Sequence, residues 1–166
     1  MTAPGGGGDA GTSSVGRRRR RPEPSPIERA LGLLTRREHS RQELARKLAF
    51  RGVAAGDAQA AIDKLADAGW QDDTRFAESL VRSRASAGYG PAFIRAELGT
   101  HALGSEAIAI AMDGFDGDWA ENARELVRRR HPDALAGDRA AQRKAADFLL
   151  RRGFAMEHVR AAIPGG

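Results

Sequence analysis

Arginine supplies nearly all the positive charge of this chain, and the arginines recur in short clusters. Lysine occupies only Lys47, Lys64 and Lys144 among 27 basic residues. A guanidinium group can bind a carboxylate or a phosphate through two parallel hydrogen bonds. The clusters therefore predict contacts with an acidic protein surface or a nucleic-acid backbone, although genomic base composition explains the same bias. They are Arg17 to Arg21, Arg36 and Arg37, Arg82 and Arg84, Arg128 to Arg130, and Arg151 and Arg152.

The other residue types do not predict catalysis. Cysteine is absent, which excludes disulfides, thiolate metal sites and a cysteine nucleophile. The sequence contains no Gly-Lys-Ser/Thr phosphate loop and no Gly-x-Ser-x-Gly nucleophile motif. The histidines lie far apart, without the i, i+4 spacing of a zinc site, at His39, His101, His131 and His158. We expect neither an enzyme nor a site for a metal or another cofactor.

Two local patterns have structural explanations. Asp72 and Asp73 precede an apolar helical segment, where carboxylates cap a helix and interact with its positive end. The segment Gly88-Tyr89-Gly90 lacks the third glycine of a dinucleotide-binding loop. It predicts a glycine-assisted turn, with Pro91 as the first residue of the next helix and Tyr89 as an exposed contact.

The positive charge is concentrated at the N-terminus. The whole chain of 166 residues has a formal net charge of +5. Residues 1–26 contain five arginines against Asp9 and Glu23, about +3, so the remaining chain is nearly balanced. This segment is rich in glycine, proline and serine, which predicts a disordered extension. Because no apolar run is long enough for a membrane span or a signal peptide, we expect a cytoplasmic protein without membrane contacts.

Apolar residues recur at helical spacing from Ile27 onward. Ser40 and Glu43 have the spacing of a capping box at the start of a second helix, and Asp57 is a candidate N-cap for a third. Gly52 stands where a helix can end in the left-handed conformation. A unit of three helices is therefore predicted over residues 27–70.

The same unit occurs three times. The second and third copies are predicted over residues 71–115 and 116–163, with an insertion from His131 to Arg139 in the third. In the first helices, the matched sets are Ala30, Leu33, Leu34 and Arg37; Ala77, Leu80, Val81 and Arg84; and Ala123, Leu126, Val127 and Arg130. In the second and third helices, they are Leu44, Leu48, Gly52, Val53 and Ile62; Ile94, Leu98, Ala102, Leu103 and Met112; and Ala145, Leu149, Gly153, Phe154 and Ile163.

This repetition predicts an all-α fold, a tandem array of three three-helix repeats with an elongated or curved body over residues 27–166. We expect Trp70, Phe76 and Phe93 in the core and Trp119 at the surface. The recurrence of Arg37, Arg84 and Arg130 at matched positions predicts a basic stripe along the array.

The motifs inside the repeats resemble the RecX family from Ile27 to Ile163. The opening segment Arg36 to Leu44, the central segment Asp72 to Ala77 followed by Gly88 to Pro91, and the closing segment Phe148 to Phe154 are similar to that family's motifs and occur in the same order. Ala102 stands where many members have glycine, and the N-terminal extension lies outside the resemblance.

The resemblance implies a regulator that binds the RecA recombinase and its nucleoprotein filament. It would mainly inhibit the ATPase, strand-exchange and co-protease activities of RecA during DNA repair and recombination and in the SOS response. The chain is expected to be monomeric. The residues chosen for contact with the filament or with DNA phosphates are Arg37, Arg82, Arg84, Tyr89, Arg130, Arg151 and Arg152. The alternative is a direct binder of single- or double-stranded DNA, in which the three-helix units act like helix-turn-helix modules.

Overall fold

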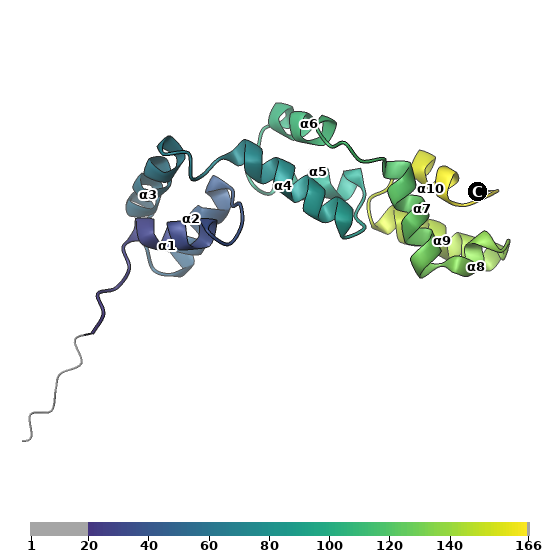
Figure 1. Cartoon of the computed structure of the whole chain (residues 1–166), viewed down its shortest axis with the longest axis horizontal. Coiled ribbons are helices and arrows are strands. Elements are labelled where there is room, and N and C mark those ends of the chain that lie inside the picture. The colour runs from purple at the N-terminus through teal and green to yellow at the C-terminus, as the bar shows by residue number, and fades with distance from the viewer. Residues whose placement is uncertain (1–19, 166) are drawn as a thin grey trace, which may run out of the picture.

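A computed structural model describes residues 20–165, and these form ten helices and no strand. The first repeat consists of α1 (Pro26–Leu34), α2 (Arg41–Phe50) and α3 (Ala55–Asp67). The second consists of α4 (Asp73–Ser86), α5 (Pro91–Gly99) and α6 (Ser105–Asp113). The third consists of α7 (Trp119–Arg130), the short α8 (Pro132–Leu135), α9 (Arg139–Arg151) and α10 (Met156–Ala162). The repeats follow one another in an elongated row, as predicted (Figure 1).

Most of the extension predicted to be disordered, residues 1–19, lies outside the described residues. Residues 20–25 precede the first helix without helical structure, and Arg20 and Arg21 are exposed. Ser25 then caps α1 in a capping box with Glu28.

The first helix of each repeat begins at an equivalent polar cap. Ser25, Asp72 and Asp118 occupy these positions, and each side chain accepts a hydrogen bond from a backbone N–H in the first turn. The prediction that Asp72 caps this helix is confirmed. The Asp73 carboxylate instead accepts a hydrogen bond from the Arg41 N–H of the first repeat. The prediction for Asp57 is wrong because α3 begins two residues earlier, after Ala54.

Only half of the predicted capping box of α2 forms. Ser40 Oγ accepts a hydrogen bond from the Glu43 N–H at 3.0 Å. The Glu43 carboxylate does not return to the Ser40 backbone, because it pairs with Arg37 and Lys47 instead.

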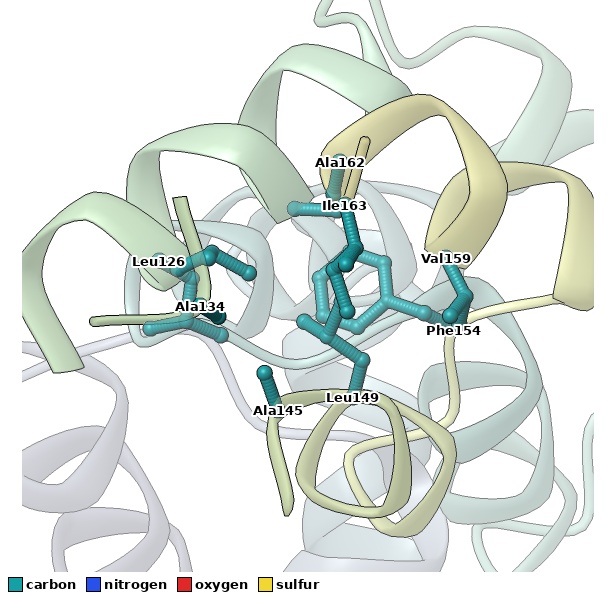
Figure 2. Packing of buried hydrophobic residues seen from close by; sticks show 10 residues of the cluster. Leu126, Ala134, Ala145, Leu149, Phe154, Val159, Ala162 and Ile163 are labelled. Atoms are coloured by element: carbon teal, nitrogen blue, oxygen red, sulfur yellow. The ribbon is translucent and has the colours of Figure 1, made fainter. Parts of the chain in front are cut away.

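Each repeat has a separate hydrophobic core. Matched positions of the second helices, Leu44 and Leu48, Ile94 and Leu98, and Ala145 and Leu149, are all fully buried. The core of the third repeat is the largest, and its side chains from α7, α8, α9 and α10 converge in Figure 2. The predicted repeat of three-helix units is therefore confirmed by the burial pattern.

The burial of several aromatic residues differs from the prediction. Phe76 is buried, as expected, but Trp70 and Phe93 are 55% and 38% exposed, so their assignment to the core is wrong. The Trp70 N–H bonds to the Leu65 carbonyl to close the end of α3, which leaves the indole outside. Trp119 is half-buried against Phe115, with 4.5 Å between ring centroids, and not a free surface residue.

The second helix of each repeat is followed by a residue in the left-handed conformation. Gly52 and Gly153 have φ angles of 80° and 89°, and Ala102 has 56°. A Cβ atom in this conformation approaches the following carbonyl oxygen, which costs about 1–2 kcal/mol. Ala102 therefore adopts a strained conformation at a position where the other two repeats have glycine.

Candidate partner-binding surface

Neighbouring repeats meet through the ends of their second helices. At the first junction, Ser40 Oγ lies 2.7 Å from His101 Nδ1, and the Arg41 N–H donates to Asp73 Oδ1 at 2.9 Å. At the second, the N–H groups of Gly90 and Ala92 donate to the carbonyls of Arg152 and Gly153 at 2.7 and 3.0 Å. Ser40 and Gly90 are equivalent positions, as are His101 and Arg152, so both junctions use the same geometry.

The first junction is polar and buried. His39 is 2% exposed, and burial lowers the pKa of its imidazole. The His39 ring lies 3.0 Å from the Arg37 carbonyl through Nδ1 and 3.0 Å from Lys47 Nζ through Nε2. This arrangement assigns a neutral ring that donates to the carbonyl and accepts from the ammonium group. Gln71, which is 4% exposed, donates to the His39 carbonyl and to Asp73.

The second junction is a close approach of two backbones. A Cβ atom on Gly90 would lie 2.4 Å from the backbone of Gly153, so only glycine is accommodated there. The Arg152 guanidinium lies over the ring of Tyr89, 4.6 Å from its centroid, and donates to the Ala87 carbonyl at 3.4 Å. Tyr89 also stacks on Phe93 at 4.2 Å. Tyr89 and Arg152, both predicted as partner contacts, are therefore joined to each other across this junction.

Two other predicted arginines form ion pairs within the chain. Arg84 donates two hydrogen bonds to the Glu97 carboxylate, at 2.6 and 2.7 Å. This pairing raises the pKa of Arg84 and lowers that of Glu97. Arg37 pairs with Glu43 but keeps about half of its side chain exposed.

The remaining predicted arginines face solvent. Within residues 20–165, the side chains of Arg82, Arg130 and Arg151 are exposed and form no ion pair. Arg82 lies on α4, Arg130 ends α7 and Arg151 ends α9. These three groups are available to carboxylates or phosphates of a partner.

A groove of about 220 Å³ between the first and second repeats brings Arg37 and Arg84 together. Acidic and basic groups alternate along its walls, so it is not a uniformly positive channel. Arg82 lines a different hollow, beside α6. The groove is lined by Arg37, Glu38, Glu43, Phe76, Ser79, Leu80, Ser83, Arg84, Glu97 and His101.

Sequence reasoning missed a second arginine site in the third repeat. Arg139 and Arg143 rim a hollow of about 520 Å³ between α9 and α10. Their i, i+4 spacing was the signal that could have identified them.

In the part of the chain that the structure describes, every helix is too short or too polar to span a lipid bilayer. The same residues include no group of three or more histidine and acidic side chains placed to hold a metal ion.

The stacked three-helix units and their outward-facing guanidinium groups define a helical-repeat protein with surfaces suited to a macromolecular partner. Three family models match it, described as the first, second and third three-helix domains of RecX, over residues 27–65, 72–112 and 116–163. The chain belongs to the RecX family.

Two relatives named regulatory protein RecX support this assignment. The protein from Stenotrophomonas maltophilia strain R551-3 is 61% identical over 154 residues, covering 93% of this chain and 94% of that protein. The protein from Xanthomonas axonopodis pv. citri strain 306 is 60% identical over 146 residues, covering 88% and 90%.

Two solved structures show the same fold. A crystal structure of regulatory protein RecX superposes with a TM-score of 0.69 at 22% identity, covering 85% of this chain and 72% of that chain. RecX from Lactobacillus salivarius gives a TM-score of 0.67 at 22% identity, covering 82% and 91%.

Proposed function

We propose that this protein binds RecA and its nucleoprotein filament and mainly inhibits the ATPase, strand-exchange and co-protease activities of RecA. The observation that carries the proposal is the match of all three repeats to RecX family models. The protein would act in the cytoplasm as a monomer and catalyse no reaction itself.

Inhibition follows mechanically from the shape. An elongated row of repeats can lie across successive RecA protomers, and each repeat presents its own contacts. Binding would oppose the movements that accompany ATP turnover and strand exchange, because a ligand shifts a conformational equilibrium toward the state that it binds more tightly.

The exposed guanidinium groups of Arg82, Arg130 and Arg151, together with the half-exposed Arg37, are the proposed contacts. They would bind carboxylates of RecA or phosphates of the DNA within the filament. Arg84, Tyr89 and Arg152 have contacts inside the chain that explain their presence. A partner contact for these three stays a prediction.

The test is the RecA ATPase on single-stranded DNA with the triple variant Arg82→Glu, Arg130→Glu and Arg151→Glu. We expect inhibition to weaken at least tenfold, since about 1.4 kcal/mol corresponds to a factor of ten. Lys64→Glu is a single-site control for charge reversal, because Lys64 is an exposed cation outside the proposed set. Unchanged inhibition by the folded triple variant would remove these residues from the surface.

A second experiment distinguishes RecA binding from direct DNA binding. Tight association with naked DNA that collapses as salt is added, with no effect on RecA, would favour the direct DNA binder. The same ATPase assay with residues 1–21 removed, a truncation that keeps the Ser25 cap of α1, tests the Arg-rich extension, which we expect to add affinity without being required for inhibition.

A further inference from the structure

The hollow between α9 and α10 has charged groups on its rim and apolar groups on its floor. Arg139, Gln142, Arg143 and Ala146 lie along one face of α9, at the spacing i, i+3, i+4, i+7. Opposite them stand Val159 of α10 and the two residues that follow this helix, Ile163 and Pro164. A face of this pattern is suited to an amphipathic segment with a complementary charge.

The two arginines lie in the N-terminal half of α9. Arg139 is in the first turn, where the helix dipole disfavours cations. Asp138 caps the helix and accepts hydrogen bonds from the N–H groups of Ala140 and Ala141, and the first turn itself contains no acidic residue. Within residues 20–165, neither Arg139 nor Arg143 forms an ion pair. An external anion would supply the missing partner.

Comparison with the first repeat shows that an ion pair there is replaced here by a neutral contact. Gln142 and Pro164 occupy the positions equivalent to Arg41 and Asp63, by the same offset that relates Leu44 to Ala145. In the first repeat, the Asp63 carboxylate pairs with Arg41 and accepts a hydrogen bond from Gln59 at 3.0 Å. In the third repeat, the equivalent position is Pro164, whose carbonyl accepts from Gln142 at 3.1 Å.

The position of the hollow in the array indicates what kind of group binds there. At both junctions, the start of a second helix is covered by acceptor groups of the next repeat, namely the Asp73 carboxylate or the carbonyls that end α9. The third repeat is the last in the described array, and the start of its second helix, α9, lies toward the C-terminal end (Figure 1). Its hollow is therefore adjacent to a stacking position that no further repeat covers within residues 20–165.

We propose that this hollow is a docking site for an acidic, helical segment of a protein partner. A carboxylate of the partner lies between Arg139 and Arg143, and an apolar side chain packs over Ala146 and Pro164. This contact resembles the addition of one more helical element to the array. The inference stands apart from the proposed function, since it does not require that the partner be RecA.

The probe is a short, fluorescein-labelled, helix-forming peptide with glutamates spaced i, i+4 around a leucine. Fluorescence anisotropy would measure its binding to the full chain. We expect the double variant Arg139→Glu and Arg143→Glu to weaken binding about tenfold or more. Folding should be preserved in this variant, because acidic residues near a helix N-terminus are favourable; circular dichroism would confirm it.

The control is Lys144→Glu, which makes one such charge reversal, half the change of the double variant, next to Arg143 but outside the hollow. It should change the affinity by less than about twofold, since a single exposed pair contributes little. An equal loss with Lys144→Glu, or equal binding of a peptide with glutamine in place of glutamate, would overturn the proposal. Absence of binding up to about 1 mM peptide would also overturn it.

Analytical ultracentrifugation tests the other possible occupant of the hollow, which is a second copy of this chain. A monomer at all concentrations supports the proposal. Head-to-tail oligomers that dissociate in the Arg139 and Arg143 double variant would overturn it, because the hollow would then bind another array. Neither experiment contains RecA, so its outcome is independent of the ATPase test.

Discussion

Glu43 is a partly buried carboxylate in the first turn of α2 that links this helix to the loop before it. Its side chain is 14% exposed and contacts Arg37, Lys47 and, at 3.9 Å, His39. Burial alone would raise the pKa of Glu43, but the hydrogen bonds from Arg37 and Lys47 outweigh burial and lower it to about 2. The charged form is therefore stabilised by folding.

This shift predicts a pH-dependent contribution to the free energy of unfolding. A depressed carboxyl pKa stabilises the folded state above the unfolded value of 4.5, and this stability is lost as the pH falls toward about 2. Glu43→Gln should lower the free energy of unfolding by about 2 kcal/mol at neutral pH. Urea titrations should show the difference from the native chain shrinking below the unfolded pKa. Glu78→Gln, which changes an exposed carboxylate, is the control. If the difference in free energy of unfolding between Glu43→Gln and the native chain did not change with pH, the lowered pKa of Glu43 would be contradicted.

Ala102 offers a test of backbone strain. Replacement by glycine removes the left-handed penalty of the Cβ atom but increases the entropy of the unfolded chain. We expect Ala102→Gly to raise the free energy of unfolding by up to about 1 kcal/mol, measured by urea denaturation. The converse change, Gly52→Ala, should lower it, because a Cβ at Gly52 meets no neighbouring atom and only its φ of 80° opposes it. Equal signs for the two substitutions would contradict this account.

At the scale of helices, the positions predicted from periodicity were accurate because burial of an apolar face follows from spacing alone. Leu44 and Ile94 could be placed in the core without knowledge of their neighbours. The partners of the charged groups could not be predicted in this way. Arg84 reaches Glu97 on the next helix, and Arg152 reaches Tyr89 in another repeat, so their contacts depend on how helices pack.

Contacts that depend on helix packing also explain why the predictions for Asp73 and Phe93 were wrong. Asp73 was assigned to capping because aspartate favours helix starts, yet its carboxylate accepts the Arg41 N–H of the preceding repeat. Phe93 stands at a packing position of the helical pattern, which predicts a core residue, yet it stacks on Tyr89 near the surface. At Asp73 a contact between repeats overrode the local preference of the residue, and at Phe93 stacking on a side chain of the same repeat did.

The second junction predicts a sharp steric effect. Gly90→Ala places a methyl group 2.4 Å from the Gly153 backbone, which cannot move without displacing α9. We expect a loss of about 1–3 kcal/mol, the usual cost of overpacking. Hydrogen exchange should increase at the amides of Gly90 and Ala92, whose bonds cross the junction. Gly99→Ala, where no atom lies within 4 Å of the added Cβ, should not destabilise the chain.

At the scale of the whole molecule, the three cores predict unfolding in parts. Each core contains residues of one repeat and few from its neighbours. Stability in such arrays is the sum of repeat terms and neighbour terms. Leu149→Ala should therefore cost about 2–5 kcal/mol within the third repeat and leave the first repeat nearly unchanged.

Hydrogen exchange resolved by peptide is the measurement for this prediction. Leu48→Ala, which removes the equivalent fully buried side chain of the first repeat, is the matched control and should give the opposite pattern. Equal loss of protection in all three repeats would show that the array unfolds as one unit.

The separation of the cores also bears on how the protein is made. The core of the first repeat is complete once the chain has been translated through α3, and that of the second requires nothing beyond the start of α7. Domains of this kind fold in order of synthesis, N-terminal first. Each finished repeat can then form before the ribosome releases the next, so nascent apolar surface is exposed only one repeat at a time.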